Sequence, residues 1–230
     1  MIRPRSPGTA LLLAAFSLAV IPAWRAATAD DDDYSRVLGS VHIAAGQHAG
    51  DATTVNGHVE IDSDAVVKRA ETVNGGVTMH AHSSATSVKT VNGSAELESG
   101  VRVAGGVEVV NGHISLDKYA DVGGRVTNVN GPIQLTGAHV GGGVETTTGD
   151  ISINGAARVE GGILVNHANS DSWFSFSKPR VPRVVIGPGA VIKGPLHFER
   201  EVQLYVSDRA SIGPVDGATP IRFSGDRPPD

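Results

Sequence analysis

Pairs of apolar residues two positions apart recur along most of the chain, with polar residues between and beside them. Residues such as His58, Glu60 and Ser115 occupy the polar positions, so hydrophobicity alternates with a period of two. This alternation predicts a series of short strands, each with one buried face. The apolar pairs are Val41/Ile43, Val59/Ile61, Val77/Met79, Ala95/Leu97, Ile114/Leu116, Ile133/Leu135 and Ile151/Ile153.

A second apolar pattern follows in the later units and predicts a second strand in each of them. Two consecutive glycines often lie within it, as at Gly105-Gly106 and Gly123-Gly124. The apolar positions of this second strand are Val103/Val107, Val122/Val126, Val140/Val144 and Val159/Ile163.

The strand pattern is tied to a repeated tripeptide, Val-Asn-Gly. From Leu38 through the five asparagines and Thr148 to Asn166, the equivalent position recurs at steps of 18, 18, 18, 19, 19, 18 and 18 residues. So constant a period is typical of identical structural units stacked on one another. The Asn-Gly pairs are Asn56, Gly57, Asn74, Gly75, Asn92, Gly93, Asn111, Gly112, Asn130 and Gly131.

Two architectures can use this repeat. In an antiparallel meander each Asn-Gly would be a hairpin turn, whereas in a solenoid it would mark a corner of one coil. The constant period favours the solenoid, because only stacked coils place the same side chain over its equivalent, about 4.8 Å away. Stacked asparagines would hydrogen-bond along the axis, and glycine would permit a positive φ at the bend. The sequence therefore predicts an all-β fold, a single-stranded parallel β-solenoid (β-helix) with coils of about 18 residues.

The repeat is interrupted once and then resumes. Residues 167–183 contain Trp173, Phe174 and Phe176, while the alanine column continues on both sides of this segment. Rings on such a loop would either stack on sugars or pack against the solenoid, and we favour packing because exposed apolar clusters are unfavourable unless they bind something. The column is Ala120, Ala138, Ala157, Ala190 and Ala210.

The N-terminal segment has the pattern of an export signal. Arg3 and Arg5 precede an apolar stretch that is too short to span about 30 Å of membrane, and Ala27-Thr28-Ala29 predicts cleavage after Ala29. The expected organisation is a signal peptide at 1–29, an acidic leader at 30–37, the solenoid at 38–216 with the aromatic insertion at about 167–183, and a loose tail at 217–230. We expect no membrane span in the mature chain and a periplasmic, cell-surface or extracellular location.

The amino-acid composition limits how the core can be built and excludes some classes of chemistry. Aromatic residues make up only 4% of the 230 residues and glycine contributes 29 of them, so the core must be built from small and aliphatic side chains. The absence of cysteine excludes disulfides and thiolate chemistry. The net charge of −5 gives no electrostatic argument for nucleic-acid binding.

Two family resemblances follow from these motifs. The Thr-Val-Asn-Gly repeats followed by alternating apolar residues resemble a bacterial family of adhesin-like β-strand repeat proteins. The later stretch Ile-Gly-Pro-Gly-Ala-Val-Ile-Lys-Gly-Pro-Leu, residues 186–196, resembles the bactofilins, which are polymer-forming cytoskeletal β-helices. Bactofilins as a family are cytoplasmic, whereas the N-terminal pattern of this chain predicts export. Neither resemblance implies catalytic residues.

Candidate chemical groups are spread along the predicted outer faces. Glu60 and Glu96 share a column but lie two coils apart, about 10 Å, which is wide for a catalytic carboxylate pair. His58 and His113 hold equivalent places three coils apart and cannot share a metal ion. We interpret all of these as solvated surface residues.

His80 and His82 alternate on one predicted strand and would form only a weak chelate. We therefore expect no metal site, no cofactor and no enzymatic activity. The predicted function is an exported structural or adhesin-like solenoid of the bacterial envelope. A carbohydrate-binding or degenerate polysaccharide-active β-helix and a scaffold that self-associates end to end are the alternatives, with cell-envelope polysaccharide or a second copy as partner.

Overall fold

A computed structural model describes residues 32–167 and 180–229 of the chain. The chain divides into the units Met1–Asp30 and Asp31–Asp230, and every described strand belongs to the second unit. Within the described ranges all regular structure is β-strand, and none of it is a helix with the length and hydropathy needed to cross a membrane. The all-β prediction is therefore confirmed for this part of the chain.

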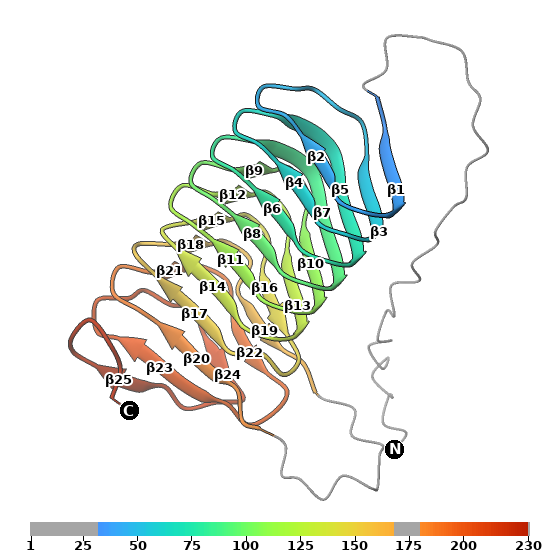
Figure 1. Cartoon of the computed structure of the whole chain (residues 1–230). Helices are drawn as coiled ribbons and strands as arrows, with labels where there is room; N and C mark the ends of the chain where they lie inside the picture. The colour runs from blue at the N-terminus through green and yellow to red at the C-terminus, as the bar shows by residue number, and fades with distance from the viewer. Residues whose placement is uncertain (1–31, 168–179, 230) are drawn as a thin grey trace, which may run out of the picture. The chain divides into compact units, whose positions relative to one another are not determined.

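One sheet of ten parallel strands forms the first side of a stack of coils (Figure 1). Each strand pairs with the equivalent strand of the next coil, as Val59 with Val77 and Ile61 with Met79. The strands are β2 (Val41–Ile43), β4 (Val59–Ile61), β6 (Val77–Met79), β8 (Ala95–Leu97), β11 (Ile114–Leu116), β14 (Ile133–Thr136), β17 (Ile151–Asn154), β20 (Arg183–Ile186), β23 (Gln203–Ser207) and β25 (Ile221–Phe223).

The second sheet has fifteen strands and divides into two branches after its first four. The first four are β1 (Tyr34–Leu38), β3 (Ala52–Asn56), β5 (Val66–Asn74) and β7 (Ser84–Asn92). The short-strand branch consists of β9 (Arg102–Val103), β12 (Asp121–Val122), β15 (His139–Val140), β18 (Arg158–Val159) and β21 (Val191–Ile192). The long-strand branch consists of β10 (Val107–Asn111), β13 (Val126–Asn130), β16 (Val144–Thr146), β19 (Ile163–Val165), β22 (Leu196–Phe198) and β24 (Val215–Asp216).

The two sheets together form a parallel β-solenoid of about ten coils, as the sequence repeat predicts. The register resumes after the aromatic insertion, because β20 pairs with β17 so that Ile186 lies beside Ile153. Trp173, Phe174 and Phe176 themselves lie outside the described residues.

The core is a set of aliphatic columns that run along the stack. All seven predicted apolar pairs of the ten-stranded sheet are buried, and Ile61, Ile114 and Ile151 are fully inaccessible. Four members of the alanine column are buried with them, while Ala210 is partly buried. Because small and β-branched residues fill the narrow space between the sheets, the only buried aromatic rings of the described residues are Phe198 and Phe223, while Tyr34 packs partly buried against the N-terminal end of the core.

The second predicted strand of each later unit is wrong in one respect. Val103 and Val107 lie on two different strands, β9 and β10, with a bend between them. The same division separates Val122 from Val126 and Val140 from Val144. A spacing of four fits one strand, but the intervening glycines form a corner of the coil.

The solenoid extends beyond the expected boundaries at both ends. Strand β1 begins at Tyr34, within the predicted acidic leader, and pairs with β3. Strand β25 lies within the predicted loose tail, pairs with β23 and buries Phe223. In each case a short segment adds one more strand to an existing parallel edge. The predicted signal peptide lies outside the described residues.

The predicted asparagine ladder is present. The Nδ2 of Asn74 donates to Oδ1 of Asn56 at 2.9 Å, and the same bond joins each later asparagine to the one before it as far as Asn130. The hydroxyl of Thr148 donates to Asn130 and continues the ladder by one coil. The corners are therefore joined along the axis by side chains as well as by backbone.

The glycine beside each ladder asparagine has a different role from the one expected. Gly75, Gly112 and Gly131 have positive φ, but Gly57 and Gly93 do not. At all five positions, a Cβ atom would collide with the backbone carbonyl of the equivalent glycine one coil earlier. Close axial stacking, rather than the sign of φ, is what all five require.

An inward threonine two residues before the asparagine completes the corner. Its hydroxyl donates to a glycine carbonyl of the preceding corner, as Thr72 does to Gly57 at 3.0 Å and Thr90 does to Gly75 at 2.8 Å. Asn128 replaces threonine in a later coil and donates to Gly112 and Gly131. The threonine hydroxyls and the Nδ2 of Asn128 are thus hydrogen-bonded, as buried polar groups generally are, whereas Oδ1 of Asn128 is buried without a partner.

Candidate metal centre

Two columns of polar side chains lie side by side on the outer face of the ten-stranded sheet. The first contains the middle residue of each strand, and register places these residues one above the other. The second contains the residue directly after each strand, held by backbone bonds such as His80 N–H to Ile61 C=O at 2.8 Å. The first column runs His42, Glu60, Thr78, Glu96 and Ser115, and the second runs Asp62, His80, Glu98 and Asp117.

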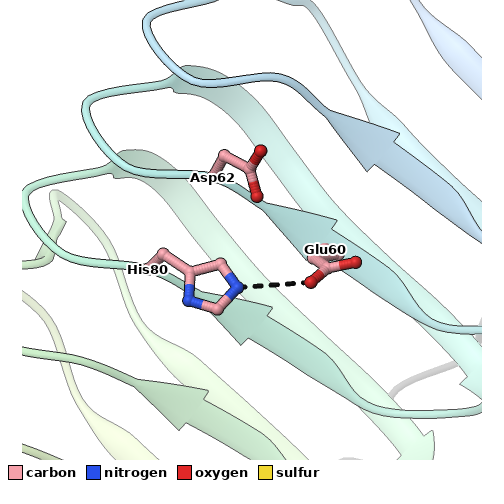
Figure 2. Close-up of side chains that lie close together, drawn as sticks. All are labelled: Glu60, Asp62 and His80. Carbon is pink, nitrogen blue, oxygen red and sulfur yellow. Dashed lines mark hydrogen bonds and ion pairs between the residues drawn. The ribbon is translucent and has the colours of Figure 1, made fainter.

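Glu60, Asp62 and His80 form a compact cluster where these columns meet strands β4 and β6. Figure 2 shows the three side chains on the same face of the sheet, with Glu60 and His80 directed toward each other across the two strands. One potential ligand atom from each residue lies within 4.8 Å of those of the other two. We call these three residues the Glu60–Asp62–His80 cluster.

Coil length explains how the cluster forms. Because a coil has 18 residues, His80 lies one coil beyond Asp62 in the second column, and Thr78 lies one coil beyond Glu60 in the first. Glu60 and His80 are therefore diagonal neighbours, 20 residues apart. Thr78 is short and its hydroxyl is bonded to the ring of His58 at 2.9 Å, so it does not block the diagonal contact.

His80 has a carboxylate at each ring nitrogen. Its Nε2 lies 3.3 Å from Oε1 of Glu60, and its Nδ1 lies 3.0 Å from Oε1 of Glu98 in the next coil. A neutral imidazole has one donor and one acceptor nitrogen, so it can donate to only one of the two carboxylates. The arrangement is satisfied when the ring carries a second proton or when another cation occupies the side that faces Glu60.

The electrostatics of the ring follow from this geometry. Partial burial lowers the pKa of His80, but the hydrogen bonds to Glu60 and Glu98 and the charges of both carboxylates together outweigh it. The pKa of His80 is therefore raised above its ordinary value of 6.5. The cluster attracts positive charge.

Two further residues hold the outer atoms of the cluster. Glu98 is fixed at both oxygens, because Oε1 contacts the ring of His80 and Oε2 accepts from the Ala81 N–H at 3.2 Å. His42 contacts Oδ2 of Asp62 through Nε2 at 3.0 Å. The side chains of His80 and Asp62 remain 30% and 32% exposed, so the cluster is open to solvent and to dissolved ions.

The donor set defines what the cluster could hold. One imidazole nitrogen and two carboxylates are ligands that divalent transition ions such as zinc accept.

A shallow hollow continues the same outer face toward the middle of the solenoid. His113, Ser115, Pro132 and Gln134 line it, and a second hollow beside it is lined by Glu96, Glu98 and Asp117. His113 contacts Glu96 at 3.2 Å and the hydroxyl of Ser94 at 2.7 Å. Both hollows are open to solvent, and the second one is lined mainly by polar surface.

The prediction that His80 and His82 alternate on one strand is wrong, because β6 ends at Met79. His80 follows this strand and contacts Glu60 and Glu98, whereas His82 lies in the following turn with φ of 63°. His58 bonds to Thr78 and His113 to Glu96, so these two lie in separate contacts, as expected.

The other side of the stack carries a contrasting ionic network. Glu160 accepts from Lys193 and Arg158 at 2.8 and 2.6 Å, and these two bonds lower its pKa to about 2. On the long-strand side, Glu108 pairs with Lys89 and Glu145 pairs with Arg125. In these places a basic residue of this chain already neutralises the carboxylate.

Sequence reasoning missed the cluster because it compared residues only within one strand or one column. The structure adds diagonal contacts between residues 20 positions apart, as in Glu60–His80, His42–Asp62 and Arg125–Glu145. In an 18-residue coil this offset is one coil plus two residues. A search for acid–histidine pairs at that offset would have found the site.

No family model, no curated protein and no solved structure matches the chain. The two family resemblances therefore depend on the repeat pattern and on the parallel β-solenoid alone.

Proposed function

We propose that this chain is an exported, non-catalytic β-solenoid with a structural or adhesin-like role in the bacterial cell envelope. The observation that carries this proposal is the direction of its polar contacts. The asparagine ladder and the ion pairs Lys89–Glu108 and Arg125–Glu145 all join one coil to the next. A stack joined in this way along several columns offers long repetitive faces, which suits a spacer or a binding surface.

Export is supported by the sequence of the first 29 residues, with its basic start, short apolar stretch and Ala-Thr-Ala site. The test is the intact mass of the protein recovered from the periplasm, surface and cytoplasm of its native host. We expect a chain that begins at Asp30 outside the cytoplasm. A full-length chain in the cytoplasm would contradict export and favour a cytoskeletal role.

The binding role is tested on a glycan array with the mature protein, together with incubation of the protein with cell-envelope polysaccharide. We expect retention of at least one polysaccharide and no shortening of its chains. Retention of none, with normal assembly of the envelope in a strain lacking the protein, would contradict both the adhesive and the structural role.

A degenerate polysaccharide-active β-helix is a second candidate, and the Glu60–Asp62–His80 cluster favours it. Carboxylates and a histidine on one open face are the groups that polysaccharide cleavage would use. Release of new sugar ends by the native protein, abolished in Glu60→Gln, would establish this activity in place of the non-catalytic role.

End-to-end association is a third candidate, favoured by the terminal strands. Val37 and Leu38 on β1 are 68% and 76% exposed, and Ile221 on β25 is 47% exposed. Within the described residues, β1 and β25 each pair with one strand only. Parallel edges with exposed apolar residues can add further strands. Filaments in electron micrographs that disappear in the double variant Val37→Lys, Leu38→Lys would establish assembly.

A further inference from the structure

We propose that the Glu60–Asp62–His80 cluster is a binding site for a divalent transition-metal ion of the zinc class. The ligands would be Nε2 of His80, Oε1 of Glu60 and one oxygen of Asp62, the three groups whose donor atoms already lie within 4.8 Å of one another. The site spans two neighbouring coils, so a bound ion would join β4 to β6 on the outer face (Figure 2).

The first support is the orientation of His80. Glu98 faces Nδ1, and its other oxygen is held by the Ala81 N–H, so the carboxylate is not free to turn away. A proton on Nδ1 that is donated to Glu98 leaves the lone pair on Nε2, which points toward Glu60. Metal-ligating histidines in proteins are oriented by a carboxylate in this same manner.

The second support is the fixation of Asp62. His42 contacts Oδ2 of this carboxylate at 3.0 Å, which restricts the rotation of Asp62 and leaves its other oxygen for an ion. Each end of the ligand set is thus held by a residue from an outer coil, His42 from the coil before and Glu98 from the coil after. These two are positioning residues, not ligands.

The third support is charge. The two columns from His42 to Asp117 contain five carboxylates and neither lysine nor arginine. Glu160, by contrast, is neutralised by Arg158 and Lys193 of this chain. Where the chain supplies no fixed cation, an ion from solution can take that position.

The geometry fits a small ion. Zinc binds imidazole and carboxylate at about 2.0–2.2 Å, so ligand atoms around it lie about 3.5 Å apart. The observed separations of up to 4.8 Å close to this value through small side-chain rotations, which the partly exposed positions of Glu60 and Asp62 permit. Three protein ligands leave a coordination position for water or for a donor from another molecule.

The test is zinc chloride titrated into the untagged full chain, freed of metal with a chelator, and followed by calorimetry at pH 7.5. We expect one equivalent bound with micromolar or tighter affinity, weakened more than tenfold in His80→Gln and in Glu60→Gln. Glu98→Gln should retain the stoichiometry with an affinity about 10–100-fold weaker, as expected for a positioning residue. Far-UV circular dichroism confirms that each variant is folded.

His139→Gln is the matched control. His139 also contacts two carboxylates, Asp121 at 2.6 Å and Glu160 at 3.7 Å, but Glu160 is already bonded to Arg158 and Lys193. This variant should bind zinc as the native chain does. The proposal is overturned if the native chain binds no zinc at 100 μM (about 100 times a micromolar Kd), or if folded His80→Gln and Glu60→Gln both bind with native affinity, which would place the ion elsewhere.

Discussion

The early and late coils differ at the corner between the two parts of the fifteen-stranded sheet. In β5 and β7 the chain passes this corner as one nine-residue strand, with Lys68-Arg69 or Thr86-Ser87 at the bend. From residue 105 onward glycine pairs occupy the bend, with Gly194-Pro195 and Gly213-Pro214 in the last coils, and the strand is divided into a short and a long one. The strands on both sides of this corner nevertheless keep the same parallel register in the early coils and in the late coils.

The difference shows what the glycine pairs are for. Between Ala85 and Val88 two residues turn the corner, whereas three residues lie between their partners Val103 and Val107. The additional residue makes the bend sharper and brings the backbones of neighbouring coils together. A Cβ at Gly105 would lie 2.7 Å from the carbonyl oxygen of Thr86, and one at Gly142 would lie 2.6 Å from that of Gly124. Glycine is required in the sharp corner because of axial contact.

The largest loss of stability is therefore expected when a side chain is added at a glycine of the sharp corner. Gly142→Ala should lower the free energy of unfolding by about 3 kcal/mol, because the methyl group must displace backbone in the preceding coil. Urea unfolding followed by circular dichroism measures the change. Thr86→Ala, at the exposed and gently curved corner of the early half, is the control and should change stability by less than about 0.5 kcal/mol. Equal effects would remove the distinction between the two corners.

A smaller effect is expected at the asparagine corner, which both halves share. Asn111→Ala removes the bonds to Asn92 and from Asn130, with a loss of about 1–2 kcal/mol. Gln134→Ala on the outer face is the control and should be close to neutral. A neutral Asn111→Ala in the same urea experiment would show that the ladder adds nothing to the backbone bonds.

The pH dependence of the early half should depend on His80. Because its pKa is raised in the folded chain, its contribution to stability is fully present below about pH 6.5 and is lost as the pH rises through the folded pKa. Glu60, Asp62 and Glu98 are the charged groups that face the ring. His80→Gln should therefore destabilise the metal-free chain by up to about 1 kcal/mol near pH 5.5 and less at pH 8.5.

His58→Gln is the control for this measurement, because the ring of His58 bonds to the Thr78 hydroxyl rather than to a carboxylate. Unfolding midpoints measured from pH 5 to 9 give the comparison. A difference between native and His80→Gln chains that grew with rising pH would contradict the assignment.

The smallest effect on stability is expected in the late coils, at Glu160. Its pH dependence is opposite to that of His80, because the contribution is lost as the pH falls. The pKa of Glu160 is lowered to about 2, so its contribution is present above about pH 4.5 and is lost as the pH falls toward 2. The unfolding midpoints of the native chain and Glu160→Gln should converge as the pH falls from 5 to 2. Glu201→Gln, an exposed position, is the control and should show no such convergence. A constant difference in Glu160→Gln would contradict the role of Arg158 and Lys193.

The sequence predicted the features that repeat and missed those that depend on contacts between coils. The alternation around Val59/Ile61 and the constant step of the asparagines were sufficient for the strands, the coil length and the ladder. They were insufficient for the corner between Val103 and Val107, because a spacing of four fits a continuous strand as well as a bend. The cluster was missed for a related reason, since Glu60 and His80 are neighbours only when a diagonal across two coils is considered.

The corner residues also bear on how such a chain can change its length during evolution. The step from Asn92 to Asn111 is 19 residues, with three residues at the corner where the preceding coil has two, yet the strands on either side keep their partners. The insertion before Arg183 is likewise confined to the connection between β19 and β20. Single codons and long segments can therefore be gained at corners, whereas within a strand the smallest change that preserves every buried column is the duplication or loss of a whole coil.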